Sequence, residues 1–152
     1  MAEPILKVVN LKKHYPICKG MFNKQVATRY VVDGIYYDQH DTDFSTPYPG
    51  IPEVLEALQN RGIKLAVASN KYQSATERLI THYFPTLRFE AVLGQREGIP
   101  VKPDPTIVND ILQATDIARE EVLYVGDSGV DMQTALHAGV DAVGVAWGFR
   151  PH

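Results

Sequence analysis

Val122-Leu-Tyr-Val-Gly-Asp-Ser-Gly-Val-Asp131 is the stretch that decides the fold of this chain. It predicts an apolar strand over 122–125, then a glycine and two acidic residues four positions apart, Asp127 and Asp131. Carboxylates that follow a buried strand lie at the edge where parallel α/β sheets bind ligands. Because carboxylate oxygens suit Mg²⁺, we expect Asp127 to be a metal ligand. A strand followed by an Asp-Ser helix cap is the alternative interpretation.

Two upstream stretches carry the donors and the positive charge that a phosphate site needs. Ala66-Val-Ala-Ser-Asn-Lys71 predicts a strand that ends in a hydroxyl, and Val101-Lys-Pro-Asp-Pro105 places a lysine before a proline-opened helix. Ser69 and the backbone around Asn70 would donate hydrogen bonds to phosphate oxygens, and Lys102 would neutralise phosphate charge. The alternatives are a strand-end turn residue at Ser69 and a solvated loop lysine at Lys102. The order of the three stretches favours the phosphate site.

From residue 51 onward the sequence alternates between helical and strand patterns of apolar residues. The first helix is expected to begin at Pro52 and to stop at Gly62. Alternation of this kind with short connections is typical of βαβ units around a parallel sheet. We therefore expect an α/β domain with helices over 52–60, 73–83, 105–112 and 130–138, and strands over 63–69, 89–93, 122–125 and 142–146.

Ser69, Lys102 and Gly126-Asp127-Ser128 with Asp131 resemble the second, third and fourth motifs of the haloacid-dehalogenase superfamily of phosphohydrolases. The likeness is to its phosphoglycolate-phosphatase-like branch and covers about residues 36–152. It implies a three-layer, Rossmann-like parallel sheet with almost no cap domain, Mg²⁺ as cofactor and a small phosphorylated metabolite as substrate. The implied site comprises catalytic Ser69, Lys102 and Asp131, the substrate-binding residues Asn70, Lys71 and Ser128, and the metal ligand Asp127.

The resemblance also implies a nucleophile that the sequence does not match. The superfamily opens with an apolar strand ending Asp-x-Asp-Gly, in which the first Asp attacks phosphorus. Asp33-Gly34 fits the second Asp and the glycine, but Val31 then stands at the position of the nucleophile. Asp41-Thr-Asp43 has the spacing without a preceding buried strand. Since covalent catalysis needs the nucleophile, we expect impaired or absent phosphatase activity, with Asp33 as the candidate substitute.

Residues 1–35 predict a separate β segment, with strand candidates over 5–11 and 26–32. A loop is expected between them, and the two strands form a hairpin or stay separate. Leu6 to Pro16 and Val31 to Ile35 resemble the start of the ATPase subunits of oligopeptide and dipeptide permeases, although the phosphate-binding Gly-x-x-x-x-Gly-Lys-Ser/Thr loop is absent from the sequence. The chain thus resembles a chimera of this segment and a core over 36–152 that is incomplete at both ends. We expect residues 28–32 to replace the first strand of the family, between strands 63–69 and 122–125.

The composition of the chain argues against some classes of binding partner, nucleic acid and membranes among them. The 152 residues are 45% hydrophobic with a net charge of -3, which gives no basic footprint for nucleic acid. No apolar run approaches the roughly 20 residues of a membrane span, the start does not resemble a signal peptide, and Cys18 has no second cysteine to pair with. A cytoplasmic protein is the default expectation. The alternative function is a non-catalytic scaffold that binds phosphate and Mg²⁺ weakly or completes its sheet as a homodimer.

Overall fold

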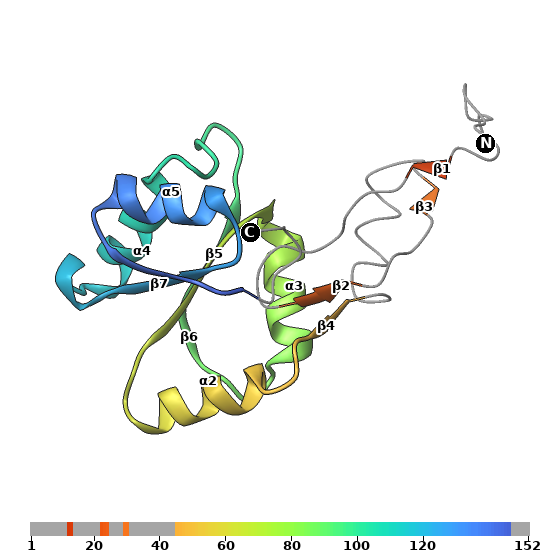
Figure 1. Cartoon of the computed structure of the whole chain (residues 1–152), viewed down its shortest axis with the longest axis horizontal. Helices are drawn as coiled ribbons and strands as arrows, with labels where there is room; N and C mark the ends of the chain where they lie inside the picture. Colours follow the sequence, from red (N-terminus) through yellow and green to blue (C-terminus); the bar gives the residue numbers. More distant parts are fainter. Residues whose placement is uncertain (1–11, 14–21, 25–28, 31–44, 147–152) are drawn as a thin grey trace.

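The computed structural model describes residues 12–13, 22–24, 29–30 and 45–146 (Figure 1). From residue 51 its helices and strands alternate in the predicted order, and boundaries differ from the predicted ones by up to three residues. The elements of this part are α2 (Ile51–Asn60), β5 (Leu65–Tyr72), α3 (Gln73–Tyr83), β6 (Phe89–Gln95), α4 (Thr106–Thr115), a 3-10 turn (Arg119–Glu121), β7 (Leu123–Gly126), α5 (Gly129–Ala138) and β8 (Asp141–Gly144).

The parallel strands of the core form two pairs. β5 runs parallel to β6, with Val67 opposite Val92, and β7 runs parallel to β8, with Val125 opposite Val143. Within the described residues these pairs are separate two-stranded sheets, because β5 and β7 do not hydrogen-bond to each other as strands. The parallel α/β prediction is confirmed, but the sheet is divided where one continuous sheet was expected.

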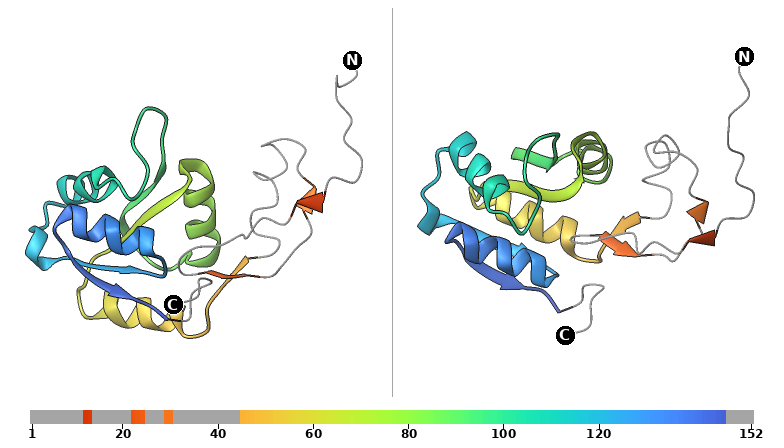
Figure 2. Two further views of the ribbon diagram at one scale, coloured as in Figure 1. Left: turned by 45° about the horizontal axis from the view of Figure 1, so that its top comes forward. Right: turned by 90° about the horizontal axis from the view of Figure 1, so that it is seen from above.

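The expected replacement of the central strand by residues 28–32 is wrong for the part of that range that the structure describes. β3 (Arg29–Tyr30) pairs antiparallel with β1 (Lys12–Lys13) instead of entering between β5 and β7. β2 (Phe22–Lys24), which falls in a predicted loop, pairs antiparallel with β4 (Ser45–Pro47). In Figures 1 and 2 the β2–β4 pair lies next to the α/β core, and the β1–β3 pair lies farther from it. Asp33, Asp41 and Asp43 lie outside the described residues.

Two apolar clusters give the β5–β6 pair a helix layer on each face, which confirms the three-layer arrangement. One cluster joins Leu79, Ile80 and Phe84 of the α3 region to Val67 and Val92. The other joins α4 and α5 to the opposite face of the pair and to β7, through Ile107, Val108, Leu112, Ala135, Ala138 and Val140, with Ala68, Leu93 and Tyr124 packed against them. Alternate residues of a strand point to opposite faces, so neighbours such as Val67 and Ala68 belong to different clusters.

One face of the β7–β8 pair is exposed. Leu123 and Val125 are each 59% exposed, and Val143 is 44% exposed. α2 has no buried residue, although Ile51 and Leu55 pack partly against the first cluster. The third layer is therefore incomplete over β7 and β8 within the described chain. No helix in this part of the chain has the length and apolar character to cross a membrane.

The difference between the packed and the exposed parts of the core can be tested by replacing one leucine in each part with alanine. Leu79 is 2% exposed and Leu123 is 59% exposed. We expect Leu79→Ala to lower the free energy of unfolding by about 2–5 kcal/mol, since it leaves a cavity, and Leu123→Ala to lower it by less than about 1 kcal/mol. Urea denaturation measures both. Equal losses would mean that another surface covers Leu123 in solution.

Candidate active site

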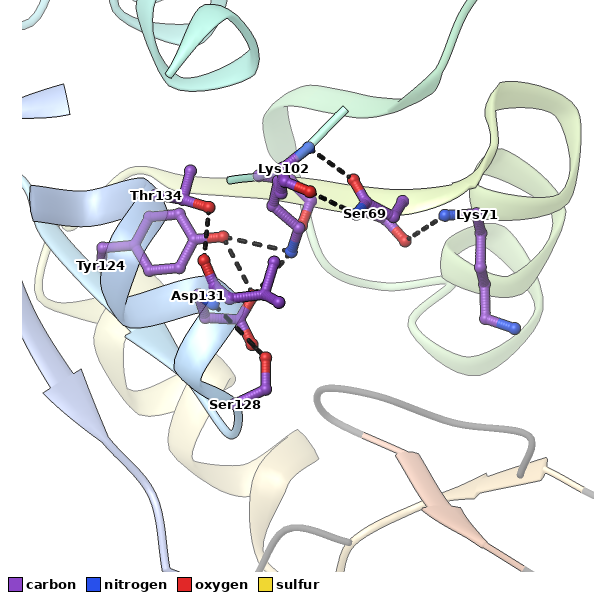
Figure 3. A network of polar contacts seen from close by, with 10 residues as sticks. Ser69, Lys71, Lys102, Tyr124, Ser128, Asp131 and Thr134 are labelled. Atoms are coloured by element: carbon purple, nitrogen blue, oxygen red, sulfur yellow. Dashed lines mark hydrogen bonds and ion pairs between the residues drawn. The ribbon is translucent and has the colours of Figure 1, made fainter. Parts of the chain in front are cut away.

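Lys102 lies between the two strand pairs and contacts both (Figure 3). Its ammonium donates to Asp131 Oδ1 at 2.7 Å, to the main-chain oxygen of Ala68 in β5 at 3.0 Å and to the hydroxyl of Tyr124 in β7 at 3.2 Å. The Lys102 and Asp131 side chains are only 11% and 8% exposed. A buried charge requires an opposite charge and hydrogen bonds, and Lys102 has both.

The backbone of Lys102 is held by the side-chain amide of Asn70. The Lys102 N–H donates to Asn70 Oδ1 at 2.9 Å, and Asn70 Nδ2 donates to the Lys102 carbonyl at 3.1 Å. An amide side chain presents one acceptor beside two donors, so it can pair with a peptide group in this reciprocal way. Asn70 therefore fixes the lysine loop to the carboxyl end of β5.

Asp131 is oriented by the turn that begins α5. Ser128 is the N-cap of this helix: its hydroxyl accepts from the Asp131 N–H at 3.3 Å and also donates to Asp131 Oδ2. Burial alone would disfavour the carboxylate, but the charge of Lys102 and the hydrogen bonds outweigh it, and the pKa of Asp131 falls below its ordinary value of 3.8. Burial, together with the Asp131 charge, raises the pKa of Tyr124, so its hydroxyl stays protonated.

Two glycines allow the close packing of the elements that carry these groups. A Cβ on Gly126 would lie 2.3 Å from Asp131 Cβ, and one on Gly94 would lie 2.6 Å from the Lys71 carbonyl oxygen. Both distances are shorter than nonbonded carbon and oxygen atoms tolerate. The glycine of the Gly126-Asp127 run thus has a steric function: it lets α5 bring Asp131 against the end of β7.

Ser69 and Lys71 form a turn at the end of β5. The Lys71 N–H donates to Ser69 Oγ at 3.1 Å, which is the strand-end turn considered as the alternative for Ser69. The side chain of Lys71 extends away from Lys102 in Figure 3. Ser69 stands between Ala68 and Asn70, both of which contact Lys102, so its hydroxyl belongs to the same strand end.

Asp127 has one buried carboxylate oxygen, Oδ1, without a hydrogen-bond partner among the described residues. An unpaired buried oxygen of this kind suits a metal ligand at the end of β7. The described residues contain no group of three or more acidic, histidine or cysteine side chains that could hold an ion. Mg²⁺ commonly takes one or two carboxylates and completes its shell with water and phosphate oxygens, so this single donor fits that mode of binding.

The structure joins four of the predicted residues in one network and adds one residue that the sequence analysis missed. Lys102, Asp131, Ser128 and Asn70 form one hydrogen-bonded network, and Tyr124 joins it through its hydroxyl. The signal for Tyr124 was a hydroxyl-bearing aromatic side chain within an otherwise aliphatic strand, because a buried tyrosine hydroxyl usually has a partner.

The lowered pKa of Asp131 predicts how this network responds to acid. Its stabilisation is fully present above the ordinary pKa of 3.8 and is lost as the pH falls through the lower folded value. Carboxyl ¹³C NMR should therefore place the titration of Asp131 below 3.8. The melting temperatures of wild type and Asp131→Asn should converge as the pH falls through that range. Titration at or above 3.8 would contradict the ion pair with Lys102.

The chain matches known proteins along almost its entire length. Residues 3–145 match the family model of haloacid dehalogenase-like hydrolases, so the match starts nearer the N-terminus than the expected residue 36. Phosphoglycolate phosphatase from Aquifex aeolicus is 28% identical over 161 residues, which covers 97% of this chain and 76% of that protein. Phosphoglycolate phosphatase from Rhodobacter capsulatus is 34% identical over 78% of this chain and 55% of that protein.

Solved structures agree with the sequence matches. The crystal structure of a predicted phosphoglycolate phosphatase from Haemophilus somnus superposes with a TM-score of 0.70 at 31% identity, over 76% of this chain and 51% of that one. The chain thus spans about half the length of several relatives that it matches. The network around Lys102, the order of helices and strands and the match over residues 3–145 lead to one conclusion: this chain belongs to the haloacid dehalogenase-like hydrolase family.

Proposed function

We propose that this chain is a phosphatase-type core that binds a phosphate monoester and Mg²⁺ but hydrolyses the ester slowly or not at all. The observation that carries the proposal is the buried Lys102–Asp131 ion pair at the carboxyl ends of β5 and β7. A buried cation at that edge, with hydroxyl and backbone donors nearby, is suited to a dianionic group. A phosphoglycolate-like ester is the substrate class that the named relatives suggest.

Each residue has a distinct part in the proposed site. Lys102 supplies positive charge, while Ser69 and the backbone around Asn70 supply hydrogen-bond donors for the phosphate oxygens. Asp131 and Ser128 hold the lysine in place through contacts already present. Asp127 would hold Mg²⁺, which when bound would neutralise phosphate charge.

The proposed loss of turnover rests on the missing Asp-x-Asp-Gly nucleophile motif. Hydrolysis of phosphate monoesters is among the slowest uncatalysed reactions in water. Binding and charge neutralisation without the attacking group retain only a small part of an enzyme's acceleration, because the members of a catalytic unit act together.

Hydrolysis of p-nitrophenyl phosphate and of phosphoglycolate, with and without Mg²⁺, tests this proposal. We expect no turnover in the wild type beyond that of the Asp127→Ala control, together with a phosphate-induced rise in melting temperature that needs Mg²⁺ and is lost in Asp127→Ala. Phosphate that does not raise the melting temperature would contradict the proposed binding site.

Mg²⁺-dependent hydrolysis that Asp127→Ala abolishes would contradict the proposed inactivity. Asp33, Asp41 or Asp43 would then be the nucleophile, and mass spectrometry would find a phosphorylated chain from which hydroxylamine releases phosphate, leaving a hydroxamate on the aspartate. This outcome would leave the phosphate and Mg²⁺ contacts of the proposal in place.

A homodimeric scaffold is the second candidate function, and the exposed β7–β8 face favours it. Leu123, Val125 and Val143 lie on one face of that pair, and apolar surface of this kind is commonly covered by a partner. We expect the molar mass from light scattering and the melting temperature to rise with protein concentration, and Val125→Lys to suppress both changes. A monomeric mass at all concentrations would contradict the dimer.

A further inference from the structure

All three N–H groups of the Lys102 ammonium already have acceptors within the chain. An ammonium group has three donors and no acceptor. The three acceptors are Asp131 Oδ1 at 2.7 Å, the Ala68 carbonyl at 3.0 Å and the Tyr124 hydroxyl at 3.2 Å. A phosphate oxygen can therefore accept a direct hydrogen bond from this ammonium only when one of these bonds is released.

The three bonds differ in how easily they can be released. Asp131 carries the opposite charge and forms the shortest bond. The Ala68 carbonyl belongs to β5, so releasing it would leave a main-chain acceptor unpaired. Tyr124 is neutral, forms the longest bond and has a second partner, since its hydroxyl donates to Asp131 Oδ1 at 3.4 Å.

From these differences we infer that Tyr124 is a positioning residue that occupies one N–H of Lys102 until an anion replaces it. The inference rests on the proposed phosphate site. In the free protein the Tyr124 hydroxyl accepts from Lys102 and donates to Asp131. When phosphate arrives, the ammonium turns that N–H to a phosphate oxygen, and the tyrosine keeps its bond to Asp131. No proton is transferred in this exchange.

The surroundings of Tyr124 fit its role as a replaceable acceptor for Lys102. Burial and the Asp131 charge raise its pKa, so the hydroxyl remains a neutral group that can accept and donate at the same time. The ring is packed against the cluster of α4 and α5, which holds the hydroxyl in place during the exchange. The cost of anion binding then includes breaking the bond between Lys102 and Tyr124.

Tyr124→Phe removes the competing acceptor and keeps the ring. We expect it to lower the Kd for inorganic phosphate in the presence of Mg²⁺ by about threefold to tenfold, the range that one ordinary hydrogen bond provides. Isothermal titration calorimetry measures the Kd. Tyr72→Phe is the matched control, because Tyr72 is 64% exposed and should leave the Kd unchanged. Lys102→Met should abolish binding.

The outcomes separate this inference from the proposed site. An equal or higher Kd in Tyr124→Phe, with binding in the wild type and none in Lys102→Met, would overturn the role of Tyr124 and leave the phosphate site standing. Absence of binding in the wild type, or binding that survives Lys102→Met, would overturn both. As a second measurement on the unmodified chain, phosphate should shift the ring ¹³Cζ resonance of Tyr124, and an unchanged resonance would overturn the exchange.

Discussion

The ammonium of Lys102 is the group on which this core depends. It needs an opposite charge because it is buried, and Asp131 supplies that charge from α5. It also donates to a main-chain carbonyl of β5 in the place where a neighbouring strand would offer an N–H. One side chain thus pairs one carbonyl of β5 and joins this strand to α5, the helix that connects β7 and β8. The same hydrogen bonds of Lys102 therefore fix the geometry of the site and hold the parts of the core together.

A lysine side chain cannot replace a strand completely. It pairs one carbonyl, whereas a strand would pair a row of peptide groups and add apolar side chains on both faces. The consequence is visible in the described core, where β5–β6 and β7–β8 remain separate sheets. Leu123 and Val125 remain exposed although their strand has the composition of a buried one.

Local patterns predicted the elements well because those elements depend on nearby residues. α3 has the predicted bounds, and α5 begins after a Ser128 cap and ends at Gly139, which has the positive φ of 67° that favours glycine. The grouping of Lys102 with Asp131 was predictable too, since parallel strands place their carboxyl ends at one edge. A hairpin was one of the two expected arrangements of the N-terminal strands, but the residues that pair in β1 and β3 were not predictable, because short strands with little apolar character carry no signal for their register.

Several individual hydrogen bonds of the site were not predicted, because their partners lie far apart in the sequence. Asn70 and Lys102 are 32 positions apart, and the bonds between the amide and the peptide group depend on where two loops meet. From the sequence alone, Tyr124 is expected to be a packing residue. Only the structure shows that its hydroxyl lies beside two charged groups. Residue types indicated what chemistry the site could contain, while the partners of each atom required the fold.

The reciprocal bonds between Asn70 and the Lys102 backbone have a consequence for the ageing of the protein. Asparagine side chains hydrolyse slowly to aspartate, and a carboxylate can accept but not donate. Such a change would leave the Lys102 carbonyl without its donor and place a negative charge beside it. The Lys102 N–H would still donate to the side chain, so a single spontaneous reaction would remove one of the two bonds that anchor the lysine loop to β5. Preparations of this chain would then become chemically heterogeneous at one atom during storage, in a way that the encoded sequence does not reveal.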